Sequence, residues 1–570
     1  MGVVARARSA TARPGPVRTA WAWAGVTAAA AALLTFCYLR IAGATQVNSD
    51  GAGLELEAWN ILHGNVLLHG WWATDVSFYT TELPEYTAVT AFAGVRPEVV
   101  HICSALTYTL LVLLAAFVAR GRARGTEGAA RALLAAAVML APQPAGPTQV
   151  LLGSPDHVGT GAPVLVLLLL LDRAPARDGR LRWYVPVLAG ALLAWAIVGD
   201  PLIEVAGVAP LFLACLIRAV RRLRAAWPGR SARSLRSAWT TAGYELSLAA
   251  AAVAAVPVAA AASRLLVALG GFHSAKAWYG LLSPQQVAHG LGLAGESVFA
   301  LFGADFHAVH GAGNVAFALL HLSGLALVLA AVVLAAWRLL RPDGDGDLVA
   351  DILVLAIAAN FAAFVIDVPK PNIYAAHEIG PLLSIGAALT GRLLGGPLSA
   401  RPPEAGSRWR RGLPAGLAAV LACYAVLLGI AAAHPQAAPR NVSLAAWLER
   451  HNLRSGLAPY WEAASVTVDT GQAVKMLSVA QSGWHGQLAP RKWQADVRVP
   501  SPGQDSANFV IVSPAEDVHL GRALAAFGKP AASYQYGPFT ILVYRQNLLP
   551  ELARSAAGPV KGTVSTAAGG

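Results

Sequence analysis

The sequence predicts an all-α polytopic membrane domain of about 11 transmembrane helices, followed by a small C-terminal α/β domain. Of its 570 residues, 56% are hydrophobic and only 13% are charged, whereas soluble proteins carry about 25% charged residues. Apolar runs of roughly 20 residues, the length that crosses a bilayer, recur along the first three quarters of the chain. After residue 434 the hydropathy falls and the apolar spacing changes, which indicates a separately folded domain.

The apolar runs set the domain boundaries. The candidate spans are 20–44, 99–119, 131–149, 155–171, 184–199, 201–217, 244–268, 315–337, 350–366, 373–394 and 413–433. We therefore divide the chain into a disordered cytoplasmic N-terminus (1–18), a transmembrane domain (19–433), an α/β domain (434–552) and a disordered tail (553–570). The first span lacks a small-residue cleavage site and is interpreted as a retained anchor.

The charge pattern predicts the topology. The net charge of +12 comes mostly from arginines that gather at every second loop, such as 6–18, 120–131, 173–182, 218–236, 338–341 and 401–411. The loops between them hold almost no basic residues, which is the positive-inside pattern. It places the N-terminus in the cytoplasm and the α/β domain outside a multi-pass plasma membrane, and it argues against a nucleic-acid partner. The preponderance of Arg over Lys, with abundant Ala, indicates a bacterial membrane.

The four cysteines all fall within candidate spans. They are interpreted as small apolar residues, so the sequence implies no disulfide or metal framework.

The C-terminal domain is predicted to mix helices and strands. Helical spacing is found over Ser443–Arg454 and Asp517–Phe527. Strand patterns are found at Ala464–Asp469, Val474–Val479, Asn508–Val512 and Phe539–Tyr544. These segments carry neither a Gly-rich phosphate loop nor a nucleophile elbow, so the domain shows no sign of catalysis.

The triplet Asn48-Ser49-Asp50 follows the first span and opens a long polar loop, 45–98, on the predicted outer side. Asp50 is a candidate general base next to the lipid headgroups. The alternative is a helix N-cap, because Asp is a good cap and the following segment has the apolar face of an interfacial helix. Both roles are compatible.

Farther along this loop, Tyr79 and Glu82 combine an aromatic face with a carboxylate, the pair of groups that binds sugars. The alternative is a plain turn with interfacial aromatics, which explains Glu82 less well.

A second outer segment contains Asp156 and His157. Ser154-Pro155-Asp156 is also a typical helix start, as is Asp200-Pro201, for which capping is the favoured interpretation. We interpret Asp156 and His157 as substrate-binding because they share the predicted face of Asp50.

A late outer segment holds Lys370, Tyr374, His377 and Glu378. An ammonium at headgroup depth suits a lipid phosphate, although a snorkelling lysine is an equal alternative. Glu378 lies inside an apolar run, where an ionised group costs about 2.5–3.5 kcal/mol at a helix centre, so it is expected to face a cavity or a partner. The histidines 273, 289, 307 and 310 lack metal-ligand spacing apart from the pair 307/310, and no zinc site is expected.

An acid after the first span, a long first outer loop, a second acidic outer loop and a C-terminal outer domain resemble the GT-C superfamily. These are polytopic glycosyltransferases that use polyprenyl-phosphate sugars, such as the protein mannosyltransferase and aminoarabinose transferase families. By position, Asp50 matches the first-loop catalytic acid of the family and Asp156 its second-loop acid. Asp50 is followed by Gly51 rather than by a second acid, so the paired acidic pattern of some members is missing. No cofactor follows from the sequence, and the use of a divalent cation stays open.

The resemblance implies an inverting glycosyltransferase that moves a sugar from a polyprenyl-phosphate donor in the membrane to an acceptor glycan, lipid or protein. Asp50 would deprotonate the acceptor hydroxyl. Lys370 with His377 would stabilise the departing phosphate, and Asp156, His157 and Glu82 would orient the sugar. Two alternatives remain: a transporter or lipid-sugar flippase, and a non-catalytic scaffold that displays the α/β domain.

Overall fold

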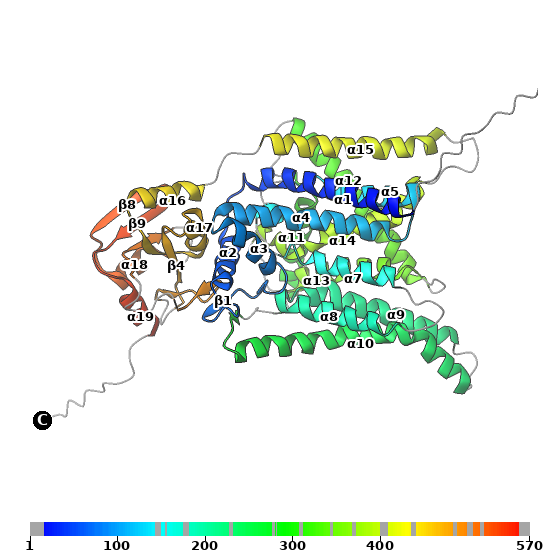
Figure 1. Cartoon of the computed structure of the whole chain (residues 1–570), viewed down its shortest axis with the longest axis horizontal. Helices are drawn as coiled ribbons and strands as arrows, with labels where there is room; N and C mark the ends of the chain where they lie inside the picture. The colour runs from blue at the N-terminus through cyan, green and yellow to red at the C-terminus, as the bar shows by residue number, and fades with distance from the viewer. Residues whose placement is uncertain are drawn as a thin grey trace, which may run out of the picture.

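A computed structural model describes residues 16–142, 150–153, 157–174, 182–226, 232–275, 280, 282–306, 312–341, 346–367, 372–399, 408–434, 440–482, 487–498, 506–513 and 518–557. It is mostly helical, with a small strand-containing C-terminal region. Figure 1 shows the long helices lying side by side in one bundle, with the α/β domain at one end of it beside α2. We call this end of the bundle the Asp50 end, because Asp50 lies in α2. The opposite end is called the Arg392 end, after a residue of α14.

Among the described residues, six helices are long and apolar enough to cross a membrane: Trp23–Ala42, Pro97–Arg120, Ala242–Ala268, Gly313–Leu340, Leu348–Ile366 and Ala375–Pro397. The expected count of eleven is therefore not confirmed. The helices that contain these segments are α1 (Pro16–Ala42), α4 (Pro97–Arg120), α10 (Ala232–Ala268), α12 (Ala312–Leu340), α13 (Leu348–Ile366) and η3 (Ile373–Ile379) with α14 (Pro381–Ser399).

The other expected spans form helices that are not among these six. They correspond to α5 (Gly125–Met139), α7 (Gly161–Arg173), α8 (Tyr184–Gly199), η2 (Glu204–Val208) with α9 (Ala209–Ala226), and α15 (Arg408–Ala433). The predicted helix start at Ser154-Pro155-Asp156 lies outside the described residues, and the residues that follow, His157–Thr160, form a turn in which His157 has φ 55°. Helix α7 begins after this turn, at Gly161.

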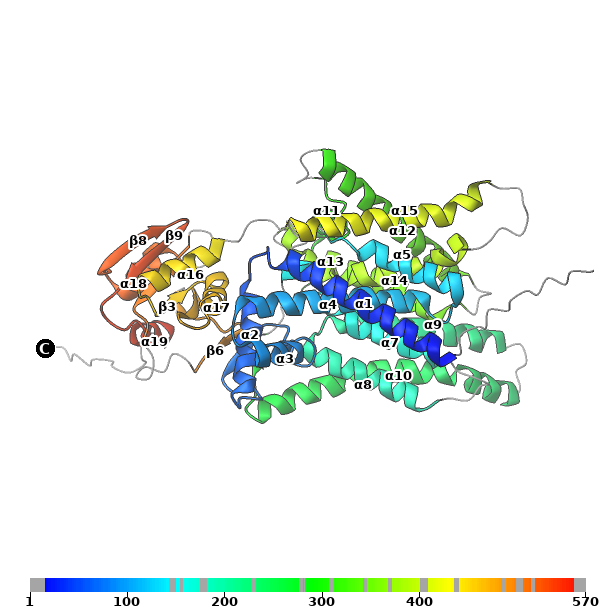
Figure 2. The same ribbon diagram turned by 45° about the horizontal axis from the view of Figure 1, so that its top comes forward.

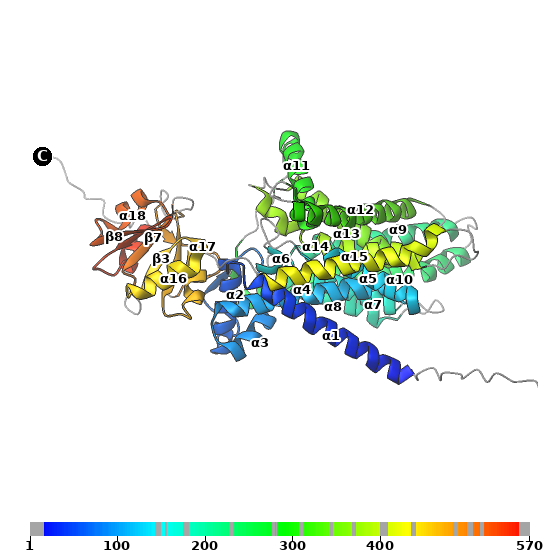
Figure 3. The ribbon, with the colours of Figure 1, turned by 90° about the horizontal axis from the view of Figure 1, so that it is seen from above.

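The views in Figures 1 and 2 agree that α10 and α15 lie on opposite edges of the bundle. In Figure 3, α11 (Pro284–Leu301) projects away from the bundle on the side opposite α1. Near the centre, α14 packs directly on α5 because two glycines leave room for the backbone of Arg131. A Cβ on Gly391 would lie 2.3 Å from the Arg131 carbonyl oxygen, and a Cβ on Gly395 would lie 2.5 Å from its Cα.

The loop after α1 folds into two helices and a short strand, α2 (Ser49–Leu62), β1 (Trp71–Ala73) and α3 (Leu83–Ala93). The helix expected after Asp50 is confirmed. Strand β1 pairs in parallel with β2 (His273–Ser274) and antiparallel with β6 (Ala495–Asp496). This three-stranded sheet joins the first loop, the segment after α10 and the C-terminal region.

The α/β domain contains a six-stranded sheet in the order β5-β4-β3-β7-β9-β8. Its strands are β3 (Ser455–Ala458), β4 (Lys475–Ala480), β5 (Ala489–Pro490), β7 (Phe509–Val512), β8 (Ala532–Tyr536) and β9 (Phe539–Val543), and its helices are α16 (Arg440–Arg450), α17 (Tyr460–Asp469), α18 (Leu520–Phe527) and α19 (Leu549–Ala557). Strands β3, β4 and β7 run parallel. The strands predicted near β4, β7 and β9 and the two predicted helices are confirmed, to within a few residues at their ends.

One predicted strand and part of the predicted disordered tail are wrong. The segment 464–469 belongs to helix α17, although Val466, Thr467 and Val468 favour a strand. This segment connects two parallel strands, β3 and β4, and such a crossover is usually a helix. Residues 553–557 belong to α19 rather than to a disordered tail.

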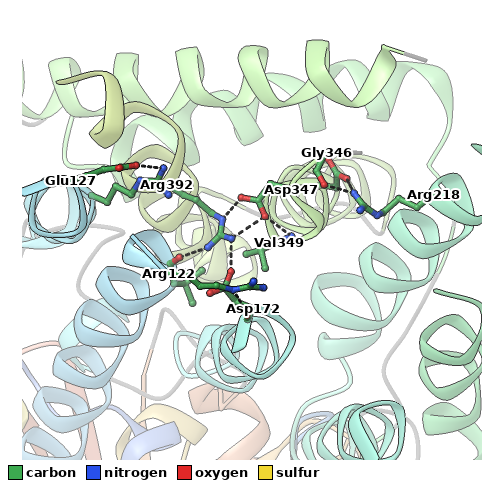
Figure 4. Close-up of polar contacts among 11 residues, drawn as sticks. Arg122, Glu127, Asp172, Arg218, Gly346, Asp347, Val349 and Arg392 are labelled. Carbon is green, nitrogen blue, oxygen red and sulfur yellow. Dashed lines mark hydrogen bonds and ion pairs between the residues drawn. The ribbon is translucent and has the colours of Figure 1, made fainter. Parts of the chain in front are cut away.

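At the Arg392 end, charged side chains from several helices meet (Figure 4). The guanidinium of Arg392 lies 2.6 Å from the carboxylate of Asp172 and also contacts Asp347. It donates a further hydrogen bond of 2.8 Å to the carbonyl of Val118. Because these groups come from α4, α7, α14 and the residue that caps α13, the cluster ties this end of the bundle together.

Candidate functional site

Asp50 lies in the first turn of α2, at the contact between the helical bundle and the α/β domain. The N-cap of α2 is Asn48, whose side-chain oxygen accepts a 3.0 Å hydrogen bond from the Gly51 N–H. The alternative role of Asp50 as the N-cap is therefore wrong. Since Asn48 satisfies the helix end, the carboxylate of Asp50 is available for other contacts.

The partners of Asp50 include two residues of the α/β domain. The hydroxyl of Tyr460, at the start of α17, donates a hydrogen bond to the Asp50 carboxylate. The amide of Gln494 donates a hydrogen bond of 2.8 Å to the Asp50 backbone oxygen, and its own oxygen lies 2.8 Å from the Tyr460 hydroxyl. Two segments separated by more than 400 residues thus fix the position of one half-buried acid.

A second polar centre lies where α7 and α8 meet. The carboxylate of Asp200, which ends α8, lies 3.0 Å from Nδ1 of His157 and accepts a hydrogen bond from the Thr160 hydroxyl. It also accepts a 2.9 Å hydrogen bond from the Leu202 N–H. Asp200 therefore caps the turn that follows it, as the sequence predicted, and pairs with a histidine as well.

These contacts change the protonation of the pair. Burial alone would lower the pKa of His157, but the Asp200 carboxylate, with smaller contributions from Glu378 and Asp75, raises it to about 9. Burial alone would raise the pKa of Asp200, but His157, Thr160 and the Leu202 N–H hold it below its usual value. At neutral pH the centre is an imidazolium–carboxylate ion pair.

Two further acids and a second imidazole lie around this pair. The ring of His377 is nearly parallel to that of His157, with centroids 6.0 Å apart and an interplanar angle of 7°. Burial raises the pKa of Asp75, and the positive charge of His157 lowers it in part. Asp75, in the first loop, and Glu378, in η3, are both close enough to act electrostatically on His157.

Glu82 packs against the turn that carries His157. The side chain is 5% exposed, and a Cβ on Gly159 would lie 1.7 Å from its Oε1. Position 159 therefore has to be glycine for Glu82 to occupy this place. Burial raises the pKa of Glu82 to about 8, so it carries a proton at neutral pH. Glu82 can act as a hydrogen-bond donor there.

Helix α3 connects the two centres. Tyr86 lies one turn after Glu82, and the Tyr86 N–H donates to the Glu82 carbonyl over 3.1 Å. A Cβ added to Gly51, the neighbour of Asp50, would lie 3.6 Å from the Tyr86 hydroxyl. The buried Tyr86 side chain thus reaches from the turn after Glu82 to the backbone next to Asp50.

The structure brings some of the predicted site residues together and not others. Glu82, His157, His377 and Glu378 gather at the His157 centre. Tyr79 is directed elsewhere: its hydroxyl donates a 3.0 Å hydrogen bond to the Val66 carbonyl, and its ring packs on Phe272. Asp156 and Lys370 lie outside the described residues, and Tyr374 is placed by its backbone alone in η3.

Five residues of the site were missed from the sequence: Asp75, Thr160, Asp200, Tyr460 and Gln494. The dipeptide Asp200-Pro201 predicted that Asp200 caps the following turn, but it did not predict that Asp200 pairs with a histidine. Tyr460 and Gln494 carried no signal, because their role depends on how the α/β domain docks. Within the described ranges, no group of three or more His, Cys, Asp or Glu side chains is arranged to hold a metal ion.

The fold and the two centres define a class: a mostly helical protein whose described part has six helices of membrane-spanning length, joined to a small α/β domain. No family model and no curated protein matches the chain. The resemblance to GT-C glycosyltransferases therefore stays a prediction.

Proposed function

We propose that this protein is a membrane glycosyltransferase that moves a sugar from a polyprenyl-phosphate donor to an acceptor hydroxyl. The observation that carries the proposal is the position of Asp50. A carboxylate after the first apolar helix is held between the helical bundle and a folded domain by Tyr460 and Gln494. A general base has to meet a lipid-borne donor on one side and an acceptor on the other, and Asp50 has the helical bundle on one side and the α/β domain on the other.

In the proposed reaction the acceptor oxygen attacks the anomeric carbon of the sugar. Its proton passes to Asp50, and the bond from the sugar to the lipid phosphate breaks with inversion. Tyr460 acts as a positioning residue, because its hydroxyl orients the carboxylate of Asp50. The polyprenyl phosphate departs with the electron pair of the broken bond.

The departing phosphate needs a positive charge. The imidazolium of His157, which is paired with Asp200, lies at the Asp50 end, and the ring of His377 is nearly parallel to it. We assign the phosphate to this pair, together with Lys370 as the sequence predicted. Protonated Glu82 would donate a hydrogen bond to a sugar hydroxyl. From the sequence, His157 was expected to orient the sugar; here it is assigned to the phosphate instead.

The ends of the bundle support a topology for the proposed enzyme. Arg122, Arg218 and Arg392 lie together at the Arg392 end, opposite the α/β domain. By the positive-inside rule this end would face the cytoplasm and Asp50 the outside of the plasma membrane. The donor would then be used in the outer leaflet.

The test is transfer by the purified full-length protein from a radiolabelled polyprenyl-phosphate sugar in the presence of a membrane extract that supplies acceptors. Asp50→Asn is expected to lower the rate by about 100-fold or more, the range for loss of a general base. The matched control is Glu57→Gln on the same helix. Burial raises the pKa of Glu57 to about 8, so a neutral amide replaces a carboxyl that is already neutral at pH 7.

Transfer at the wild-type rate by Asp50→Asn would show that Asp50 is not the base. Movement of the lipid-linked sugar across proteoliposomes, without covalent transfer, would instead establish the transporter alternative.

A further inference from the structure

The α/β domain has a cavity of about 830 Å³ beside its contact with Asp50. Its wall includes Gln481 and Ser482, which follow β4, Arg491, Lys492 and Trp493, which follow β5, and His519, which precedes α18. All these residues lie at the carboxyl ends of the parallel strands β4 and β7 or next to them.

The order of the strands makes this edge a binding edge. From β3 the chain crosses to β4 on one side and then returns to β7 on the other side of β3. In open sheets with parallel strands, ligands bind outside the carboxyl ends of the strands. The change of direction falls between β3 and β7, and the cavity lies along the same edge of the sheet, next to β4 and β5. Tyr460 lies two residues after the end of β3 and its hydroxyl contacts Asp50, so the same edge faces the proposed base.

The chemistry of the wall is cationic and aromatic. The guanidinium of Arg491 lies 4.9 Å from the centre of the Tyr460 ring, and the ammonium of Lys492 lies 5.2 Å from the centre of the Trp72 ring. Trp493 adds an aromatic ring, and the described lining residues include no Asp or Glu. The buried Nε2 of Gln481 has no hydrogen-bond partner in the structure, so its amide N–H groups can donate to a bound ligand.

We propose that this cavity binds an anionic saccharide and presents its hydroxyl to Asp50 as the acceptor of the transfer reaction. Aromatic rings suit the apolar faces of a sugar, the Gln481 amide suits a hydroxyl oxygen, and Arg491 with Lys492 suits a carboxylate or phosphate. The assignment as acceptor depends on the proposed glycosyltransferase function, whereas the preference for an anionic saccharide depends on the cavity alone.

Tyr460 joins the cavity to the base. Its ring contacts Arg491, and its hydroxyl donates to the carboxylate of Asp50. Gln494, three residues after Arg491, donates to the backbone of Asp50. A saccharide bound against Arg491 would therefore lie one side chain away from the group that removes its proton.

The experiment measures binding to the full-length protein in lipid nanodiscs by calorimetry, without a donor and hence without transfer. The probes are a hyaluronan tetrasaccharide, which carries carboxylates, the neutral chitin tetrasaccharide of the same length, and N-acetylglucosamine 6-phosphate. The variant is Arg491→Gln with Lys492→Gln. The control is Lys529→Gln, which removes an exposed cation next to the start of β8, at the opposite edge of the sheet.

We expect the hyaluronan probe to bind at least 10-fold more tightly than the neutral probe, and the double variant to abolish this preference while Lys529→Gln retains it. Tighter binding of the sugar phosphate than of hyaluronan would identify phosphate as the preferred anion. Equal binding of all probes, or a preference unchanged in the double variant, would overturn the assignment of the cavity. Separately, absence of transfer with intact anionic binding would reject the glycosyltransferase and leave the binding site in place.

Discussion

Nδ1 of His157 lies 3.0 Å from the carboxylate of Asp200, which joins the turn before α7 to the end of α8. The two side chains are 17% and 2% exposed, so the pair is largely shielded from solvent. A shielded ion pair is strongly destabilising when one partner is removed, because the other charge then stays buried alone.

The pair predicts a loss of stability at alkaline pH. His157 has a pKa of about 9 in the folded protein, against 6.5 when unperturbed. The folded state therefore holds this proton more tightly, and the stabilisation is complete below pH 6.5 and is lost as the pH rises to about 9. We expect the midpoint of thermal unfolding in detergent to fall across this window.

In Asp200→Asn the burial of His157 is no longer offset by its main counter-charge, so the His157 contribution to this pH dependence should be lost, together with on the order of 3 kcal/mol of stability at pH 7. The buried Glu57 and Glu82, whose pKa values are raised to about 8, should leave a smaller decline over the same window. His289→Gln, an exposed histidine on α11, should keep the wild-type profile. An identical profile in Asp200→Asn would contradict the ion pair.

The contact between Tyr460 and Asp50 predicts coupling between the two domains. Tyr460→Phe removes the hydroxyl that donates to the carboxylate and leaves the ring in place. A double-mutant cycle with Asp50→Asn, measured on the free energy of unfolding, should give a coupling of about 1.5–3 kcal/mol, the range for a hydrogen bond to a charged group. Tyr534→Phe, on the distant strand β8, serves as the control. Additive effects of the two changes would show that this hydrogen bond does not contribute to stability.

The contact between Gly159 and Glu82 predicts that a single methyl group disturbs the site. Gly159→Ala would place its Cβ 1.7 Å from Glu82 Oε1, and the buried Glu82 has to move. We expect a destabilisation of about 1–3 kcal/mol in thermal unfolding, typical of overpacking. Glu82→Ala should rescue Gly159→Ala, since it removes the clashing atoms. Gly295→Ala, where nothing lies within 4 Å, should be neutral or slightly stabilising.

The cluster at the Arg392 end predicts a large loss of stability without a change in substrate binding. Arg392→Ala leaves Asp172 and Asp347 without this counter-charge, and a buried pair broken in this way costs about 3–5 kcal/mol. The matched control is Arg554→Ala, whose exposed pair with Glu551 should contribute less than about 1 kcal/mol. Comparable shifts in the unfolding midpoint of the two variants would contradict the structural role of Arg392.

The sequence was informative where periodicity and local chemistry decide the structure. It predicted the helix after Asp50, the shift from a helical domain to an α/β domain, and three of its strands. It failed at 464–469, where β-branched residues lie in a crossover helix. The hydroxyls of Ser465, Thr467 and the C-cap Thr470 each donate to a carbonyl one turn back, so these polar groups have partners within the helix.

The site was predictable in part, where the local chemistry of a residue indicates that it needs a partner. His157, Glu378 and Glu82 stand out because polar groups in apolar surroundings require partners. Their partners Asp200 and Asp75 come from other loops, and that pairing depends on how the helices pack. The contacts of Asp50 with Tyr460 and Gln494 depend on docking between distant segments, for which a single sequence holds no local signal.

The three-stranded sheet around β1 also constrains the order in which the protein can be completed during synthesis. Trp72 pairs with His273 on one side and with Ala495 on the other, so the strand has one neighbour about 200 residues away and a second about 420 residues away. The first loop leaves the ribosome early but stays an open edge until the last quarter of the chain has been made. A truncated chain that ends after the helical bundle would leave this edge of β1 without its strand partner β6.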